Sequence, residues 1–515
     1  MLIDGRSVAA GAELKAGVCV VGTGMGAVSV GRVLVEAGVD VLFLEAGPLT
    51  AGRRQPAALE IEEIGMSFRL PTSRGLEVGG GTAFWHGVCA PLDEIDFQRR
   101  EWVPHSGWPI TKSELEEPYR KAWDFLCGGD RRELSDVQAG LDQLPAAADI
   151  LRDKVYQFRS PPLRGKDKVL AWTEQGRARC VTHAVALQLV GDGTGTTRHL
   201  IAGSGGRTFT VQAQVFIVAA GALETPRLLL NSMAKPESRM GPACWWLGRN
   251  LIDHPAAYVS QVQFRKPVPG HLFSGFDIGA NVSALPGFVF ETEIQERHGL
   301  LNHTLFLRPG RSGKKVPNRA LMSFLGVRGM RDLRPAHLAA LLTDPYIRWR
   351  VAHQRLRLNA MTRHGDLFFM TEQAPNPESR VDLSESKRDA YGYPVARVNW
   401  QLSQDDIERF EKALGLVMDS YWRHPDVESV RGDQISDWID SVCSAAHHLG
   451  TARMAHSPAE GVVDANLKVF GADNLWVCDG SVFSTAGSVN PSLTICALGH
   501  RLGSHLLAKE KWLYR

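Results

Sequence analysis

A chain of 515 residues, of which 44% are hydrophobic and 22% charged, has the composition of a folded globular protein, which excludes an intrinsically disordered one. The 58 Lys and Arg residues exceed the 56 Asp and Glu residues by two, so the charge gives no reason to expect a nucleic acid, an acidic partner or a membrane surface. At about 150 residues per domain, the length predicts roughly three units.

The eight cysteines show neither a CxxC spacing nor the framework of a small disulfide-linked domain. Cys19 and Cys478 lie inside apolar runs, where a thiol behaves as a small hydrophobic side chain. No charged and then apolar leader precedes the first expected strand, so we expect no signal peptide and a cytoplasmic protein. The longest apolar stretch, 18–44, is interrupted by Arg32 and Glu36 and is not expected to span a membrane.

The first expected elements are a strand, a glycine turn, a helix and a second strand. The apolar run at 18–21 is typical of a buried parallel strand, and apolar residues recur at helical spacing over 30–37 before Gly38. A second apolar run, 41–44, ends at Glu45. This order predicts a βαβ unit with a right-handed crossover.

Between the first strand and the helix, residues 22–27 (GTGMGA) match the GxGxx[G/A] motif of dinucleotide-binding folds. Gly22 would allow the turn, Gly24 would let a pyrophosphate approach the backbone, and the small Ala27 would let helix and strand pack. The helix N-terminus would face the phosphates, and Glu45 would accept from a ribose hydroxyl. The alternative is a plain glycine-rich turn, and the motif does not separate NAD from FAD.

Later elements are less regular. Thr111 is expected to cap a helical stretch, because Glu114 follows three residues later. Strand patterns cover 181–189 and 215–218, and the second leads into a helix around 228–230.

The sequence pattern changes in the middle of the chain. From Asp253 to Asp440, strand-like pieces separated by Pro and Gly turns replace the glycine motifs, which predicts a second domain with an antiparallel sheet. Glycine-rich segments occur again after Ser441.

Three further glycine segments lie far from the first, at 78–82, 218–222 and 479–481. An NAD site is usually completed near its first motif, whereas an extended FAD needs several close backbone approaches along its length. These segments therefore favour FAD, with turns between packed strands as the alternative.

The last motif whose residues could take part in a reaction combines His447 and His448 with a downstream Asn490-Pro491-Ser492. A histidine is suited to take a hydroxyl proton near neutral pH. The alternative is structural: a histidine hydrogen-bonded in a turn, and an Asn490 that only caps a helix whose first residue is Pro491.

Taken in order, these motifs resemble those of the glucose–methanol–choline (GMC) oxidoreductases, a family of flavin enzymes. The dinucleotide motif, the GGGT segment at 79–82 and the blocks 216–230, 372–383 and 447–506 carry the resemblance, which covers nearly the whole chain. The C-terminal block is the most specific. It is closer to bacterial sugar- and alcohol-oxidising members than to fungal glucose oxidases.

The resemblance implies an α/β fold: a Rossmann-type FAD-binding domain of discontinuous segments and a substrate domain with a largely antiparallel sheet. We assign 1–130, 165–252 and 441–515 to the FAD-binding domain, and 131–164 and 253–440 to the substrate-binding domain.

By resemblance, His447 is the catalytic base, Asn490 is the second catalytic residue, and His448 is a lesser candidate. Asp479 matches an acidic residue that contacts the ribityl or phosphate region of the flavin, and Thr82 and Trp85 fall on the loop near the isoalloxazine. The expected cofactor-binding residues are Gly22, Gly24, Ala27, Glu45, Gly80, Gly81, Thr82, Trp85, Ala220, Asp479, Gly480, Pro491 and Ser492. We expect no metal.

The implied reaction oxidises an alcohol carbon: a hydride passes to flavin N5, His447 takes the hydroxyl proton, and Asn490 holds the oxygen. The helix that begins at Pro491 would stabilise negative charge near flavin N1. Some relatives bond flavin covalently to a histidine where this chain has Phe84, with His86 two residues on. This departure predicts FAD held without a covalent link.

The substrate is expected to be a small-molecule alcohol or sugar, whereas the electron acceptor (oxygen, a quinone or a protein) and the oligomeric state stay open. An arginine-rich stretch, 328–363, is interpreted as a solvated helix face, with docking of a membrane or protein acceptor as the alternative. Alternative functions are a lyase-type reaction on a flavin scaffold, a non-catalytic FAD-binding protein and a Rossmann NAD dehydrogenase.

Overall fold

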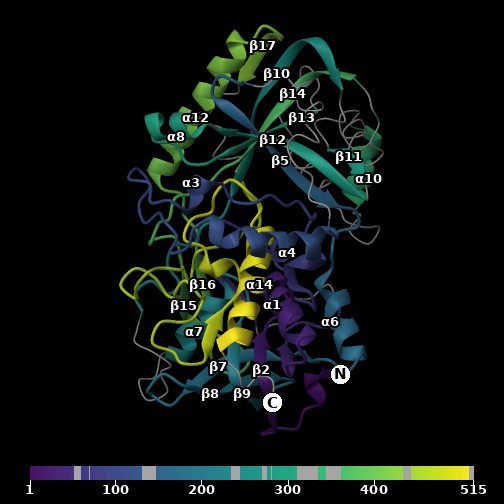
Figure 1. Cartoon of the computed structure of the whole chain (residues 1–515), viewed down its shortest axis with the longest axis vertical. Coiled ribbons are helices and arrows are strands. Elements are labelled where there is room, and N and C mark those ends of the chain that lie inside the picture. The colour runs from purple at the N-terminus through teal and green to yellow at the C-terminus, as the bar shows by residue number, and fades with distance from the viewer. Residues whose placement is uncertain are drawn as a thin grey trace.

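Two large β-sheets, one above the other in Figure 1, organise the molecule. The computed structural model describes residues 1–50, 59–68, 70–129, 147–233, 244–269, 275–279, 281–309, 335–343, 361–432 and 442–509. Strands from both ends of the sequence meet in the lower sheet of that view, and the colours show the yellow C-terminal segment against the purple N-terminal one.

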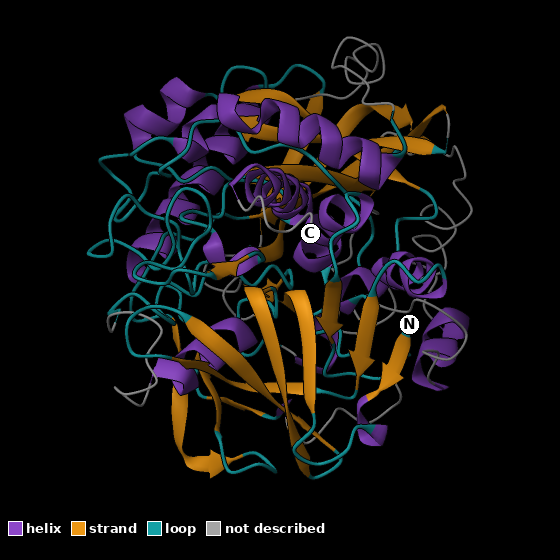
Figure 2. Cartoon of the chain, turned by 60° about the horizontal axis from the view of Figure 1, so that its bottom comes forward, coloured by secondary structure: helices purple, strands orange, loops and turns teal. Residues whose placement is uncertain are grey.

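The first sheet has the order β1-β6-β3-β2-β9-β8-β7, and β19 pairs with β9. Its strands are β1 (Leu2–Asp4), β2 (Glu13–Val21), β3 (Val41–Leu44), β6 (Arg179–Thr182), β7 (Val185–Gly191), β8 (Thr197–Ser204), β9 (Arg207–Val218) and β19 (Leu475–Val477). The pairs among β1, β6, β3, β2, β9 and β19 are parallel, whereas β8 is antiparallel to β7 and β9. Figure 2 shows the strands near the N-terminus as part of one twisted fan.

The expected βαβ unit is present as β2, α1 (Met25–Glu36) and β3. The strand pattern expected over 181–189 corresponds to two strands, because β6 ends at Thr182 and β7 begins at Val185. His183 between them has a φ of 54°, a left-handed conformation that breaks the strand. β6 then pairs with β3 and β7 with β8, so the two halves belong to different parts of the sheet.

Helix α14 (Ser492–Lys509) packs against α1, although more than 450 residues separate them in sequence (Figure 1). The contact is close because small residues of α14 face α1. A Cβ added at Gly499 would lie 2.7 Å from the Cβ of Ser29, and one at Gly503 would lie 2.6 Å from the Cβ of Val33. Helix α4 (Glu116–Cys127) also packs against α14.

The second sheet has the order β11-β12-β13-β14-β10-β17, with β18 paired to β10 and β5 to β12. Its strands are β5 (Leu151–Arg159), β10 (Pro255–Pro269), β11 (Phe276–Gly279), β12 (Val282–Phe290), β13 (Thr304–Pro309), β14 (Met361–Met370), β17 (Val427–Gly432) and β18 (Cys443–Ser444). Every described pair in this sheet is antiparallel, as expected. Helix α12 (Gln404–Arg423) supplies Phe410 and Tyr421 to the core of this sheet.

A third, small sheet packs against α7 (Glu224–Met233). It contains β15 (Arg380–Arg388), β16 (Pro394–Asn399) and β4 (Ile61–Glu63), in the order β15-β16-β4. The remaining helices are α2 (Leu70–Ser73), α3 (Glu94–Phe97), α6 (Gly165–Glu174), α8 (Thr292–His298) and α10 (Pro335–Thr343), with short 3₁₀ helices at Gly5–Ser7, Gly80–Ala83, Ser113–Leu115 and Gly480–Val482. Before the third of these, Glu114 Oε2 accepts from the Thr111 N–H at 2.8 Å and Thr111 Oγ1 accepts from the Glu114 N–H at 3.4 Å, but the residue that directly precedes the helix is Lys112 and not the expected Thr111.

This architecture confirms the expected α/β fold with a largely antiparallel second sheet. Segments of the two expected domains also share sheets: β4 pairs with β16, and β18 pairs with β10. The division of the chain at 131, 165, 253 and 441 therefore stays a prediction.

All eight cysteines lie in the described residues as free thiols. Within the same part of the chain, no helix combines the length and the apolar character needed to cross a bilayer. Most of the arginine-rich stretch, at 328–334 and 344–360, lies outside the described residues, so its interpretation stays a prediction.

Candidate active site

One cavity of about 690 Å³ lies where β2, β3 and β9 end, facing the second sheet. Ligands of open α/β folds bind at the carboxyl ends of parallel strands, so this is the expected place for a site. Every residue expected to bind a cofactor or to act in catalysis lines the cavity except Ala27, which is buried in the core. The cavity brings together segments from the start, the middle and the end of the chain.

The three glycines of the first turn, Gly22, Gly24 and Gly26, each have a different structural role. Gly22 has a φ of 99°, and a Cβ there would lie 2.4 Å from the carbonyl oxygen of Ala219. A Cβ at Gly24 would meet nothing within 4 Å, so its backbone is open to the cavity. The tightest helix packing is at Gly26, where a Cβ would lie 1.7 Å from the carbonyl oxygen of Cys478, rather than at the expected Ala27.

Glu45 is buried at the end of β3 and lines the cavity. Its Oε1 accepts from the backbone N–H of Gly47 at 2.8 Å, and its Oε2 accepts from the hydroxyl of Thr23. Burial raises the pKa of this carboxyl to about 7. Thr23 Oγ1 also accepts from the Gly79 N–H at 2.9 Å, so a residue that sequence reasoning passed over ties the first turn to the second glycine segment.

The second glycine segment is held by its own side chains. Thr82 Oγ1 donates to the Gly79 carbonyl at 2.5 Å and accepts from the Gly165 N–H at 2.8 Å. Trp85 Nε1 donates to the Leu163 carbonyl at 2.8 Å, which fixes the indole beside the cavity. The polar atoms of Thr82 and Trp85 are therefore engaged in shaping the loop.

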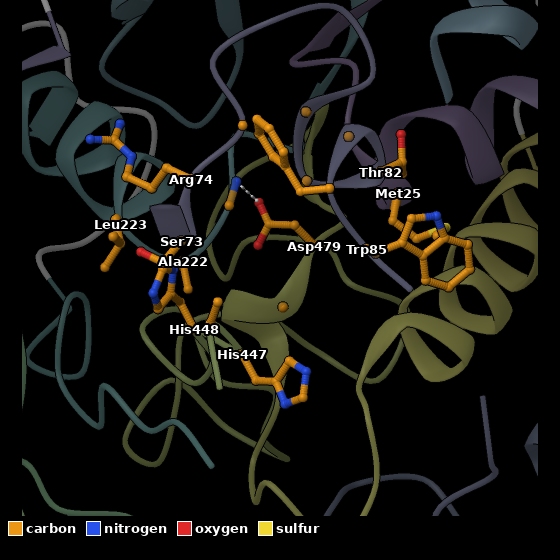
Figure 3. Close-up of a pocket in the computed structure, with 18 of the residues that line it drawn as sticks. Met25, Ser73, Arg74, Thr82, Trp85, Ala222, Leu223, His447, His448 and Asp479 are labelled. Atoms are coloured by element: carbon orange, nitrogen blue, oxygen red, sulfur yellow. Dashed lines mark hydrogen bonds between the residues drawn. The ribbon is translucent and has the colours of Figure 1, made fainter. Parts of the chain in front are cut away.

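Asp479 joins the two remaining glycine segments. Its Oδ2 accepts from the Gly221 N–H at 2.8 Å and from the Thr225 hydroxyl at 2.6 Å, and its Oδ1 accepts from the Ser481 N–H at 2.8 Å. Figure 3 shows the Asp479 carboxylate with one of these bonds as a dashed line. A buried carboxylate with three donors fixes the shape of the cavity wall.

His447 lies at the centre of a hydrogen-bonded group. Its Nε2 is 3.1 Å from Asn490 Nδ2, its Nδ1 is 3.1 Å from His254 Nδ1, and its backbone N–H donates to Asp253 Oδ1 at 2.9 Å. Burial, reinforced by the neighbouring His254 and His448, holds the pKa of His447 well below its usual value. The ring is therefore neutral at physiological pH and able to accept a proton.

The amide of Asn490 faces His447 and does not cap its helix. Helix α14 begins at Ser492, one residue later than expected, and its first bond runs from the Ile495 N–H to the Pro491 carbonyl at 2.9 Å. Pro491 and Ser492 both line the cavity, so the helix N-terminus opens into it.

His448 has different surroundings. Its ring meets Phe68 edge to face at 4.6 Å, and burial lowers its pKa to about 3. In Figure 3 the His448 side chain extends toward Ser73 and Ala222, whereas the His447 ring lies on another side of the backbone. Among the described residues, no hydrogen bond links His448 to Asn490 or His254.

Sequence reasoning missed Asp253 and His254, which follow the apolar pair 251–252 and precede Pro255. Two polar residues between an apolar pair and a strand were the available signal, but the expected domain boundary was placed there. Asp253, His254 and His447 are spaced closely enough to hold a metal ion. Their polar atoms are instead engaged with one another, with Ser444 and with the Gly487 carbonyl, and these hydrogen bonds account for the spacing.

Comparison with known proteins gives consistent matches. Two family models, both described as GMC oxidoreductase, match residues 171–256 and 375–499. The chain is 24% identical to 2-methyl-1,2-propanediol dehydrogenase of Mycolicibacterium austroafricanum over 95% of this chain and 94% of that protein. It is 25% identical to 6'''-hydroxyparomomycin C oxidase of Streptomyces lividus over 95% of this chain and 92% of that protein.

Among solved structures, a formate oxidase variant of Aspergillus oryzae RIB40, studied for FAD modification, has a TM-score of 0.60 at 16% identity. The match covers 98% of this chain and 100% of that chain, which shows a shared fold.

Proposed function

Because the chain belongs to the GMC oxidoreductase family, we propose that it oxidises an alcohol group by hydride transfer, with His447 as the base for the hydroxyl proton. The chain is an FAD-dependent oxidoreductase that acts on CH–OH groups of small molecules. The observation that supports the finer proposal is the pairing of a neutral His447 with the Asn490 amide at the wall of the cavity.

The residues present fit FAD. Cβ atoms added at Gly24, Gly81 and Gly221 would meet nothing within 4 Å, and all three glycines line the cavity, so a large ligand can approach the backbone at three distant segments. We propose that the turn at 22–26 and Glu45 hold the pyrophosphate and ribose. The segments 79–85, 219–222 and 479–480 and the start of α14 would hold the rest.

When bound, FAD supplies the acceptor for the hydride that leaves the alcohol carbon. The chain supplies the proton chemistry: His447 Nε2 accepts the hydroxyl proton, and the Asn490 amide N–H holds the oxygen. A positioned base contributes about 10²–10⁴-fold to the rate. The α14 N-terminus opens at the same place and stabilises negative charge there.

The second sheet supplies an apolar wall to the cavity. Ala256, Phe306, Phe368 and Met370 line it from β10, β13 and β14, and the register pairs Phe306 with Phe368 and Ala256 with Met370. The guanidinium of Arg308 lies 4.8 Å from the centre of the Phe306 ring. This apolar wall favours an alcohol with an alkyl chain or an apolar ring surface over an alcohol with polar groups on every side.

The proposed function is tested by mixing the FAD-loaded protein anaerobically with sugars, glycosides, aliphatic alcohols and aromatic alcohols. At least one alcohol is expected to remove the visible absorbance of the flavin, and the corresponding carbonyl compound should form in equal amount. Consumption of a substrate without lasting loss of absorbance would instead indicate a lyase-type reaction. Admitting air afterwards separates an oxidase from a dehydrogenase, because only an oxidase regains its absorbance quickly.

FAD affinity is predicted to rise with pH through the titration of Glu45. Burial favours the neutral acid and raises the pKa of Glu45 to about 7, whereas a ribose hydroxyl donates best to the ionised form. Binding should therefore tighten by up to about tenfold between pH 6 and 8. The Glu45→Gln variant should lose this dependence, and Glu45→Ala should retain FAD poorly.

Titration of the apoprotein with FAD, followed by flavin fluorescence, measures these affinities. The raised pKa also means that the apoprotein loses stability through Glu45 as pH rises from about 4.5 to about 7, and Glu45→Gln should lose less over that window. If the FAD affinity of the wild type and that of Glu45→Gln depended equally on pH, the result would contradict a role for Glu45 in binding FAD.

We predict that FAD is held without a covalent bond. Phe84 and His86 both line the cavity, and Phe84 stands where some relatives carry the bonded histidine. Acid precipitation should leave a colourless pellet and a yellow supernatant. A yellow pellet that turns colourless in His86→Ala would identify His86 as the attachment point and overturn the prediction.

A further inference from the structure

We propose that His254 is a positioning residue that fixes the tautomer of His447, so that the unprotonated Nε2 of His447 faces Asn490 and the cavity. The two imidazoles lie 193 residues apart in the sequence: His254 directly precedes β10, and His447 follows β18, which pairs with β10. The kinetic part of this inference rests on the proposed function, whereas the tautomer itself does not.

The argument starts at the far side of His254. Its Nε2 lies 2.9 Å from the carbonyl oxygen of Gly487, which can only accept a hydrogen bond, so Nε2 carries a hydrogen. His254 is fully buried, and this burial lowers its pKa to about 4, so the ring is neutral at physiological pH. A neutral ring with a hydrogen on Nε2 has a lone pair on Nδ1.

The next bond assigns the hydrogens of His447. Its Nδ1 is 3.1 Å from His254 Nδ1, and one of these two atoms must donate. Because His254 Nδ1 holds a lone pair, His447 Nδ1 carries the hydrogen, and the Nε2 of a neutral His447 is left as an acceptor. Asn490 Nδ2, which can only donate, lies 3.1 Å from that Nε2. The three bonds thus run in one direction, from Asn490 through both rings to Gly487.

Two buried carboxylates hold this chain of hydrogen bonds in place, one at the two histidines and one at Gly487. Asp253 Oδ1 accepts from the backbone N–H of His254 at 2.6 Å and from that of His447 at 2.9 Å, so one carboxylate sets the spacing of both histidines. Glu372 Oε1 accepts from the Gly487 N–H at 3.2 Å. Glu372 is also paired with Arg100 through bonds of 2.7 and 2.8 Å, and both side chains are buried.

The arrangement has the form of a base and its orienting group, with a neutral imidazole in the place that a carboxylate takes in hydrolytic triads. When His447 accepts a proton at Nε2, its Nδ1 hydrogen stays bonded to His254 and the positive charge stays on His447. A neutral partner stabilises that charge less than a carboxylate would, so His447 gives the proton up readily.

Two substitutions of His254 test the role. His254→Leu removes the acceptor for His447 Nδ1. In contrast, His254→Gln keeps an oxygen that can accept from His447 and an amide that can donate to Gly487. The matched control is His500→Leu, which removes a buried histidine of α14 that does not line the cavity.

The first readout is ¹⁵N NMR of histidine-labelled, FAD-loaded protein, in which the His447 signals are identified by their loss in His447→Ala. The wild type, His254→Gln and His500→Leu should show a hydrogen on His447 Nδ1, and His254→Leu should show it on Nε2. A wild-type hydrogen on Nε2, or an unchanged tautomer in His254→Leu, would overturn the proposal. The wild-type spectrum is sufficient to contradict the proposal, so the test does not depend on every variant being folded.

The second readout is the anaerobic rate of flavin reduction by an alcohol as a function of pH. His254→Leu should be slower by at least about tenfold, with a shifted pH profile, and His254→Gln should recover most of the rate. An equal loss in His254→Gln and His254→Leu would contradict a role through hydrogen bonding. If no alcohol reduces the wild-type flavin, the proposed function fails, while the NMR result still decides on the tautomer.

Discussion

Replacing His447 by alanine is expected to slow flavin reduction by the alcohol roughly 10²–10⁴-fold, about 3–5 kcal/mol of barrier, while FAD stays bound. The neutral Nε2 beside Asn490 is the acceptor proposed for the hydroxyl proton, and alanine leaves the oxygen without a base. Anaerobic stopped-flow measurement of the flavin absorbance gives this rate, and the absorbance before mixing gives the FAD content.

His448→Ala is the matched control, since the two histidines are adjacent and both line the cavity. His448 contacts Phe68 and lies outside the hydrogen-bonded group of His447, so its loss should cost far less rate. An unchanged rate in His447→Ala, or the larger loss in His448→Ala, would transfer the role of base away from His447.

The second large effect is expected at Gly26, where alanine should destabilise the protein by about 3 kcal/mol or more and abolish FAD binding. The added Cβ would lie 1.7 Å from the Cys478 carbonyl oxygen, and neither atom can move without separating α1 from the strand β19. Thermal unfolding followed by circular dichroism should show the loss of stability, and the purified protein should be colourless.

Gly24→Ala separates folding from cofactor binding. Its Cβ would meet nothing within 4 Å and its φ of −71° suits any residue, so the apoprotein should unfold at the wild-type temperature. The methyl group would occupy the open space proposed for the pyrophosphate, so FAD should be lost. A Gly24→Ala protein with full FAD content, or a Gly26→Ala protein of normal stability, would contradict these assignments.

The parts of the fold that sequence could predict are those determined by neighbouring residues. The apolar runs at 18–21 and 41–44 and the glycine turn between them encode the opening βαβ unit locally, because buried parallel strands need apolar side chains on both faces. The alternation of strand-like pieces after Asp253 likewise predicted the antiparallel sheet.

What sequence could not predict depends on contacts between distant segments. Gly26 is constrained by the Cys478 carbonyl, and the break at His183 becomes visible only when β6 and β7 are seen to pair with different strands. His254 was missed for the same reason, since only the fold brings it to within 3.1 Å of a residue 193 positions later.

The packing of α14 on α1 determines when the binding site can form during translation. Because β19 completes the sheet beside β9 and α14 completes the wall around the first glycine turn, the nascent polypeptide cannot assemble its binding site while these elements are still inside the ribosome. We therefore expect FAD to bind only after α14 has been translated, and a chain terminated before α14 is expected to be purified without colour.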